Sequence, residues 1–219
     1  MAVTEDTDGM RARRSDAQRN RARLLVAARE VFAESGLAVP MSEIARRAGV
    51  GIATLSRNFA TREAIIDATF APRMTAYADA MQAALGDPDP WNGFSQYVWT
   101  VCGMQAADRG FAHVLTMTFP SALELEAERT RAYKGLRTLI ARAKAAGALR
   151  PDFSSVDLAL ILMANAGVVG ATGDAAPTAW RRMVAYFVRA CAVDAVDPLP
   201  PAPRARQMQQ ALHRIHDPL

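Results

Sequence analysis

The chain has 219 residues, 51% of them hydrophobic and 22% charged, which is ordinary for a globular protein with a proper core and one or two domains. Its two cysteines, Cys102 and Cys191, show no C-x-x-C spacing, so we expect buried thiols in a cytoplasmic protein, and no disulfide or metal site. The N-terminal residues contain no apolar signal segment. The longest uncharged apolar run, 158–173, is shorter than the ~20 residues of a membrane span, so no membrane association is expected.

Nearly all the excess positive charge lies close to the N-terminus. Residues 10–62 hold eleven arginines against four acidic residues, a net charge of +7, although the whole chain carries only +4. Residues 1–9 contribute three acids, which leaves 63–219 neutral. A local excess of this size is typical of a surface that binds phosphates.

Residues 1–14 are predicted to form a disordered basic arm that includes Arg13 and Arg14. Such an arm is either merely solvated or follows a nucleic-acid backbone, and both interpretations stay open. A helix of about 16–35 follows, with apolar residues at helical spacing from Leu24 to Phe32 and Gly36 as its C-cap.

Two short helices joined by a glycine turn are predicted within residues 41–62, MSEIARRAGVGIATLSRNFATR. The first, 42–48, carries one apolar side and could be capped by Ser42. Gly49-Val50-Gly51 interrupts it, since glycine supplies the positive φ that a sharp turn needs. The second, 52–59, buries Leu55 and Phe59 and turns short polar side chains outward. This pattern predicts a helix-turn-helix with the recognition helix second, although helix–glycine–helix segments also occur in proteins that bind nothing.

Double-stranded operator DNA is the partner that this motif and its charge indicate. Thr54, Arg57 and Asn58 are expected nearest the bases, with Ser42, Ser56 and Arg62 on phosphates. The full set of predicted DNA-contacting residues is Arg13, Arg14, Ser42, Gly51, Ile52, Thr54, Ser56, Arg57, Asn58 and Arg62.

Residues 21–67 resemble the DNA-binding domain of the tetracycline-repressor (TetR) family of bacterial regulators. The resemblance rests on RLLVAAREVFAESGL at 23–37, SEIARRAGVGIATL at 42–55 and FATREAIIDA at 59–68. The family usually has Tyr in place of Ser56, His in place of Asn58 and Gly in place of Ala53, so the resemblance by itself does not assign the DNA contacts of residues 56 and 58. The resemblance implies a homodimer in which the DNA-binding head is joined to a helical ligand-binding domain.

The rest of the chain also has helical patterns, which predicts an all-α fold. A helix from Thr61 to about Leu85 should kink or break near Ala71, because Pro72 removes a backbone hydrogen bond. Further helices are expected at 91–107, 121–146, 155–172 and 178–193, with a short helix or turn before Pro120. We therefore predict a three-helix helix-turn-helix head at 15–70, a larger helical ligand-binding and dimerisation domain at 71–195, and a Pro-rich linker and tail at 196–219.

Two sites are predicted in the larger domain. Soft or aromatic side chains on converging segments, with two polar ones among them, suit a small hydrophobic effector: Trp99, Met104, Gln105, Met117, Phe119, Met163 and Asn165. The last two helices carry more apolar surface than one small domain easily buries. The family's dimer interface there implies contacts by Gly167, Gly170, Trp180, Met183, Val184, Phe187, Val188 and Cys191.

Enzymatic chemistry is not expected, because no phosphate loop, nucleophile elbow or Ser/His/Asp order is visible. No cofactor is predicted, and the spacing of His213 and His216 is weak evidence for a metal. The predicted function is a homodimeric repressor that a ligand releases from its operator. The alternative is a DNA-binding dimer without a ligand, and a cavity of a few hundred Å³ between helices 91–107, 121–146 and 155–172 would distinguish the two.

Overall fold

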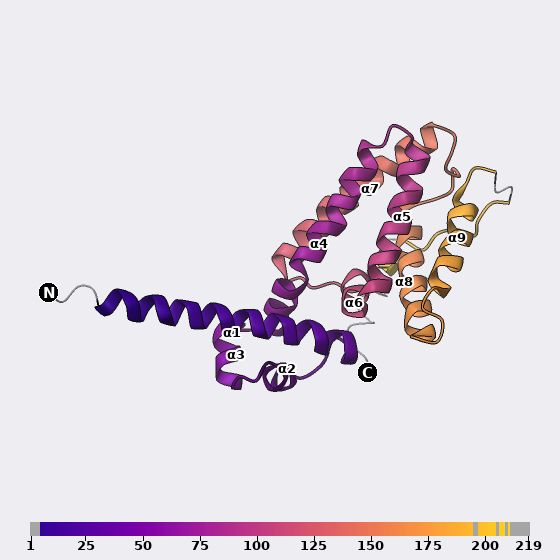
Figure 1. The fold of residues 1–219 in the computed structure, drawn as a ribbon. Coiled ribbons are helices and arrows are strands. Elements are labelled where there is room, and N and C mark those ends of the chain that lie inside the picture. The colour runs from indigo at the N-terminus through magenta and orange to yellow at the C-terminus, as the bar shows by residue number, and fades with distance from the viewer. Residues whose placement is uncertain (1–4, 195–196, 205, 209, 211–219) are drawn as a thin grey trace. The chain divides into compact units, whose positions relative to one another are not determined.

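The structure is a computed structural model that describes residues 5–194, 197–204, 206–208 and 210, with side chains from residue 16 onward. The described residues form nine labelled α-helices, a further helical stretch at 206–208 and 210, and no β-strand beyond one isolated bridge, which confirms the all-α prediction (Figure 1). The helices are α1 Glu5–Ser35, α2 Met41–Ala48, α3 Ile52–Asn58, α4 Arg62–Gly86, α5 Pro90–Ala107, α6 Arg109–Thr116, α7 Leu123–Ala145, α8 Ser155–Thr172 and α9 Ala179–Cys191.

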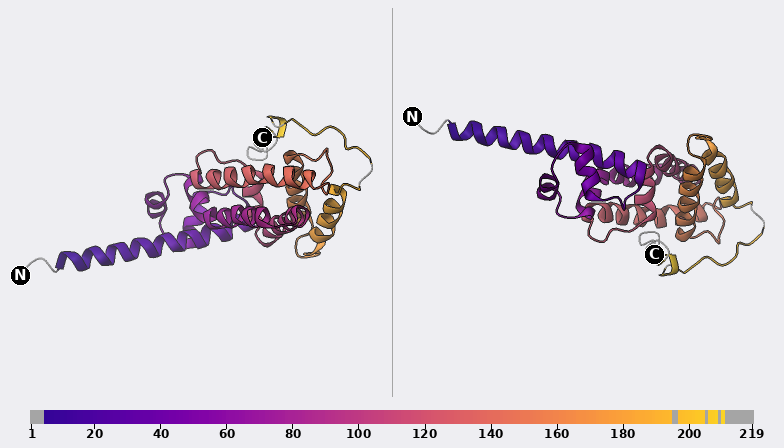
Figure 2. Two further views of the ribbon diagram at one scale, coloured as in Figure 1. Left: turned by 90° about the horizontal axis from the view of Figure 1, so that it is seen from above. Right: turned by 90° about the horizontal axis from the view of Figure 1, so that it is seen from below.

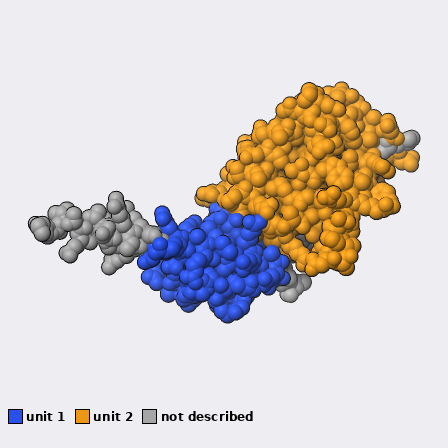
Figure 3. All heavy atoms as spheres, viewed as in Figure 1, with its two compact units in different colours: residues 1–69 blue, residues 70–219 orange. Residues whose placement is uncertain are grey.

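The chain divides into two compact units, residues 1–69 and 70–219 (Figure 3). We call them the N-terminal unit and the C-terminal unit. The helix α4 begins in the first and ends in the second.

The long helix α1 organises the N-terminal unit. Its buried stripe, from Leu24 to Phe32, packs against the buried side of α2. The helix α3 adds Leu55 and the first turns of α4 add Ile65 and Ile66, each at most 1% exposed. These contacts close a small core at the helical spacing that the sequence predicted.

The N-terminal arm differs from its prediction. The helix α1 begins at Glu5 and continues without interruption to Ser35, so residues 5–14 are helical and not disordered (Figures 1 and 2). Residues 5–15 contain no proline and only one glycine, Gly9. No residue in this segment therefore forces the helix to break before its packed part. Residues 1–4 lie outside the described part of the chain.

Of the kink or break expected near Ala71, the break does not occur. The helix α4 runs from Arg62 to Gly86 with Pro72 inside it. A proline costs a helix one backbone bond, and here apolar burial on both sides of it offsets that loss: Phe70 and Met74 are fully buried.

The C-terminal unit is built around α5, which packs against α6, α7, α8 and α9. Its Phe94, Val98 and Val101 are at most 1% exposed, whereas Asn92, Gln96 and Thr100 form an exposed polar side of the same helix. Side-chain caps fix the ends of these helices. Asp89 accepts from the backbone N of Trp91 at 2.9 Å, and Asp108 accepts from that of Phe111 at 3.0 Å.

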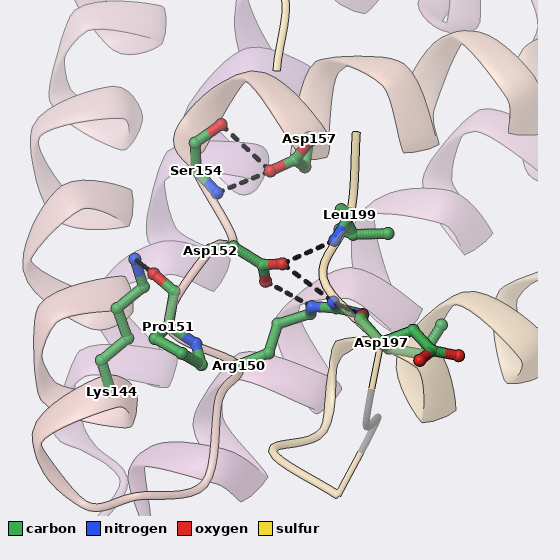
Figure 4. Close-up of polar contacts among 9 residues, drawn as sticks. Lys144, Arg150, Pro151, Asp152, Ser154, Asp157, Asp197 and Leu199 are labelled. Carbon is green, nitrogen blue, oxygen red and sulfur yellow. Dashed lines mark hydrogen bonds and ion pairs between the residues drawn. The ribbon is translucent and has the colours of Figure 1, made fainter. Parts of the chain in front are cut away.

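A buried arginine fastens the Pro-rich segment after α9 to the connection between α7 and α8 (Figure 4). Arg150 is only 4% exposed and forms a two-point ion pair with Asp152, one arm of which is Nη2 to Oδ2 at 2.9 Å. Its remaining donors reach the carbonyl oxygens of Ala190 at 3.1 Å and Asp197 at 2.6 Å. Asp152 Oδ2 also accepts from the backbone N of Leu199 at 2.9 Å. A buried guanidinium is tolerated here because its donors are paired.

The same contacts predict a dependence of stability on acid. The hydrogen bonds from Arg150, and then from the Leu199 backbone, lower the pKa of Asp152 from 3.8 to about 2. A carboxyl whose pKa is depressed by folding stabilises the protein above its unfolded pKa, and that stabilisation is lost as the pH falls toward the folded pKa. We therefore expect Asp152→Asn to lower the urea midpoint by a constant amount between pH 7 and 5. The difference from the wild type should then shrink between about pH 4 and 2.

The exposed Asp174→Asn serves as the control and should leave the midpoint unchanged throughout. A difference between wild type and Asp152→Asn that stays constant down to pH 2 would contradict this role of the Arg150–Asp152 pair.

Candidate functional site

The turn between α2 and α3 depends on Gly49. This residue has φ 64° and ψ 38°, the left-handed conformation that glycine adopts without steric cost. Its N–H donates to the carbonyl of Arg46 at 3.1 Å, and that of Val50 donates to Ala45 at 3.0 Å, which closes the end of α2. Gly51 has φ −69°, so only the first of the two glycines has the positive φ predicted for this turn.

The helix α3 buries one side and exposes the other. Leu55 is 1% exposed and Phe59, directly after the helix, 3%. The exposed side carries Ile52, Ala53, Ser56 and Arg57, and Thr54 is half-buried beside it. Ile52, Thr54, Ser56 and Arg57 therefore share the outward surface expected of a recognition helix.

Two of the predicted DNA contacts point their donors into the protein. Asn58 donates from Nδ2 to the Thr54 carbonyl at 2.8 Å, and Arg62 donates from Nη1 to the carbonyls of Leu37, at 3.0 Å, and Val39. Arg62 thus holds the loop between α1 and α2. Sequence position alone suggested an outward direction, but a carbonyl of α3 accepts from Asn58, and carbonyls of the loop before α2 accept from Arg62.

The other predicted contacts lie near the starts of α2 and α3 and in the N-terminal arm. Ser42 is exposed and is the second residue of α2, which begins after Pro40 without the side-chain cap expected from Ser42. Gly51 precedes α3, exposed and with open space beside it. The side chains of Arg13 and Arg14 lie outside the described residues.

Part of the arginine excess is neutralised within the N-terminal unit. Arg47 pairs with Glu34 at 2.7 Å and Glu30 at 3.5 Å, and Arg46 donates to Glu43 at 2.8 Å. The hydrogen bond from Arg47 lowers the pKa of Glu34, and that from Arg46 lowers the pKa of Glu43. Both carboxylates therefore stay ionised and hold these two guanidinium groups on α2.

Two arginines that the sequence analysis missed flank the helix-turn-helix. Arg21 donates to the carbonyl of Asn58 at 3.4 Å and lies 4.4 Å from the centre of the Phe59 ring. Arg23 donates to the carbonyl of Gly49 at 3.3 Å. Both side chains are exposed, and neither forms an ion pair with an acid in the part of the chain that the structure describes. Arg57 likewise has no acidic partner there and donates only to Ala53 and Thr54 of its own helix. The sequence signal for both arginines is their position on the helical wheel. Residues two apart are separated by about 200° around the helix axis, so Arg21 and Arg23 lie on opposite sides of the buried stripe of α1.

The C-terminal unit contains a half-open cavity of about 390 Å³. Its walls come from α4, α6, α7, α8 and Thr118 in the connection between α6 and α7. The volume agrees with the expectation of a few hundred Å³, but α5 contributes no wall residue, so the predicted position was partly wrong.

None of the seven residues predicted to bind a ligand lines this cavity. Gln105 and Asn165 are fully buried and bonded to each other, Asn165 Nδ2 to Gln105 Oε1 at 2.8 Å. Their other bonds go to backbone, from Gln105 to Leu162 at 3.2 Å and from Asn165 to Cys102 at 3.1 Å. These two amides join α5 to α8. The other five pack elsewhere: Met117 and Phe119 are buried, Met104 and Met163 are half-buried, and Trp99 meets Trp180 edge to face at 6.1 Å.

The predicted dimer residues fall into two groups. Val184 and Cys191 are 0% and 6% exposed within one protomer, so they belong to its core and are unavailable to a partner. Trp180, Met183, Phe187 and Val188 are half-buried. Gly167 and Gly170 are exposed on α8 with no atom near the position of an added Cβ.

The two thiols are free and buried, as expected, and burial raises the pKa of each to about 12. No cluster of metal-binding side chains occurs among the described residues. His213 and His216 lie outside them.

Comparison with known proteins matches both units to one family. Residues 24–69 match the model described as bacterial regulatory proteins, tetR family. Residues 89–189 match the C-terminal domain of transcriptional regulators similar to SbtR. The chain belongs to the TetR family of transcriptional regulators. No curated protein sequence matches the chain.

Solved structures of other TetR regulators share the fold. The fatty acid degradation regulator FadR of Bacillus halodurans is 19% identical with a TM-score of 0.58, over 78% of this chain and 93% of that one. FadR of Bacillus subtilis, solved with stearoyl-CoA, is 17% identical with a TM-score of 0.53, over 80% and 99% of the two chains. PfmR of Thermus thermophilus is 19% identical with a TM-score of 0.54, over 81% and 97%.

The turn geometry predicts different costs for its two glycines. Gly49→Ala should destabilise the protein by about 1–2 kcal/mol, since the left-handed conformation is strained for alanine. The new Cβ would also lie 2.8 Å from Arg23 Nη2. At Gly51 the φ is ordinary and the space is open. In Gly51→Ala the loss of a good N-cap and the stabilising decrease in the conformational entropy of the unfolded chain should therefore cancel to within about 0.5 kcal/mol. Denaturant unfolding of both variants measures the difference, and equal costs would contradict the assignment.

Proposed function

We propose that this TetR regulator is a homodimeric repressor that binds an operator through α3 and leaves it when a small, mainly apolar ligand enters the C-terminal unit. The observation that carries the proposal is the exposed side of α3, flanked by three guanidinium groups that the described residues leave without acidic partners. Exposed cations beside a short helix are suited to phosphates and to the edges of bases in a major groove.

In the proposed complex α3 lies in the major groove. Arg57 can donate two hydrogen bonds to a guanine, and Ile52, which is 51% exposed, can contact a thymine methyl group. Thr54 and Ser56 offer hydroxyl groups beside them, with Ser42 and the close backbone at Gly51 toward the phosphates. Arg21 and Arg23 bind phosphates on either side of the motif, while Asn58 and Arg62 keep their contacts within the protein.

The dimer is proposed to form through the outer side of α8. This helix has a mean hydropathy of 1.6, high enough by composition for a membrane span, yet only 22% of it is buried within the protomer. Its inner side packs Leu158, Ile161 and Leu162 into the core, and its outer side exposes Leu160, Gly167 and Gly170. An apolar surface of this kind calls for a partner, and small residues let a second helix approach closely. The half-buried residues of α9 extend the surface.

The ligand part of the proposal is supported by the cavity, whose volume lies within the range of small-molecule sites. One protein of this fold, FadR of Bacillus subtilis, was solved with stearoyl-CoA. A dimer that only binds DNA has no use for such a cavity, so the ligand-controlled repressor is favoured over the ligand-independent alternative. Catalysis is not part of the proposal.

Replacement of the arginines tests the DNA interface. Arg57→Ala should weaken binding to an operator selected from a random library by about 1–3 kcal/mol and alter the preferred base. Arg21→Ala and Arg23→Ala should weaken all sequences alike and reduce the salt dependence by about one counterion each. Arg46→Ala, whose guanidinium is already paired with Glu43, is the matched control and should cost less. Fluorescence anisotropy at several salt concentrations measures all four, and an equal loss for Arg46→Ala and Arg57→Ala would refute the interface.

A charge on α8 tests the dimer. Gly167→Glu has open space within the protomer and replaces a poor helix former, so the fold should be retained. Two opposed carboxylates in an apolar interface should nevertheless yield monomers that lose operator affinity. Gly86→Glu, at the end of α4 and equally open, should remain dimeric. Sedimentation and circular dichroism measure assembly and folding, and an intact Gly167→Glu dimer would place the interface elsewhere.

A further inference from the structure

The cavity of the C-terminal unit has an apolar interior and a polar mouth. Leu115, Leu136, Leu158 and Leu162 line it and are at most 6% exposed. Thr130 and Tyr133 line it from exposed positions on α7. A ligand that fits has an apolar body and places a polar group toward Thr130 and Tyr133.

The charged side chains of the cavity wall neutralise each other. Among its lining residues only Glu126 and Arg129 are charged, and they form an ion pair at 3.3 Å. Glu126 also accepts from the backbone N of Phe119 at 3.1 Å. Arg129 donates to the carbonyls of Val114 at 2.8 Å and Leu115 at 3.3 Å. The cavity therefore offers no spare counter-ion.

This arrangement lowers the affinity of the cavity for an ionic ligand. A carboxylate could recruit Arg129, and an amine Glu126, only by displacing bonds that already satisfy these half-buried groups. Otherwise the ligand's charge would be partly desolvated without a partner. Both routes reduce affinity relative to a neutral molecule of the same shape.

Neutral polar groups of a ligand do find hydrogen-bonding partners in the cavity wall. Tyr133 Oη and Ser155 Oγ lie 3.3 Å apart at the wall, a long hydrogen bond in which either oxygen can donate. Thr116 Oγ1 donates to the Ala112 carbonyl at 3.0 Å and keeps its lone pairs as acceptors. Hydroxyl groups both donate and accept, so they match an alcohol, phenol, ester or amide.

We propose that the effector of this regulator is an uncharged amphiphile, with an apolar body in the leucine-lined interior and a hydroxyl or carbonyl group among the wall hydroxyls, and that the Glu126–Arg129 pair discriminates against carboxylates and amines. This inference rests on the ligand-controlled function proposed above and names the chemical class of the ligand.

Three probes with one ten-carbon chain test it: 1-decanol, decanoate and decylammonium, titrated at pH 7 into the full-length protein by calorimetry. The expected result is that decanol binds at least tenfold more tightly than either ion. Equal or tighter binding of an ion, or no binding of any probe, overturns the inference.

Two variants locate the effect. Glu126→Gln keeps an acceptor for Phe119 but leaves Arg129 unneutralised, so the decanol preference over decanoate should fall at least threefold. Ala159→Phe fills the cavity from α8 and should abolish decanol binding. An unchanged preference in Glu126→Gln, or unchanged decanol affinity in Ala159→Phe, overturns the assignment.

Operator release is measured separately, by anisotropy of labelled DNA. If decanol binds with the expected preference but leaves the DNA bound, the inference about the ligand class stands and the proposed ligand control of repression fails.

Discussion

A helix of seven residues has almost no intrinsic stability in water, and α3 is such a helix. It exists because Leu55 and Phe59 are buried against the other helices of the N-terminal unit and because Gly49 sets the angle at which α3 leaves α2. The exposed residues Ile52, Ser56 and Arg57 of α3 lie outside that packing. In the proposed complex they are therefore free to serve recognition, and changes among them should affect the choice of DNA sequence more than folding.

The same division between inward and outward groups governs the electrostatics. The acids of the N-terminal unit hold Arg46 and Arg47 on the surface of α2, while loop carbonyls hold Arg62. Among the side chains that the structure describes, Arg21, Arg23 and Arg57 lie around the turn and α3 without an ion pair to an acid. A positive net charge is thus a poor guide to which arginine contacts DNA, because acids and carbonyls within the protein compete for the same donors.

The sequence was sufficient to predict the features that depend on neighbouring residues, such as the ends of helices. The helices α5, α7, α8 and α9 begin and end within about two residues of their predicted bounds, because Asp, Ser, Gly and Pro act over a single turn. It was insufficient where the partner is distant in the chain. Asn165 and Gln105 looked like ligand contacts and bond to each other, and Val184 looked like interface and belongs to the core. The cavity was misplaced for the same reason, since the gap left between packed helices depends on all of them together.

The Arg150 cluster sets a limit on how far the protein can be shortened. A chain cut before residue 197 would lose the Asp197 carbonyl that Arg150 binds and the Leu199 N–H that Asp152 binds. The guanidinium would keep Asp152 and the Ala190 carbonyl but would have one acceptor fewer. The Pro-rich segment is consequently part of the folded domain as far as Leu199, and the boundary of a minimal stable fragment lies beyond it, well past the last residue of α9.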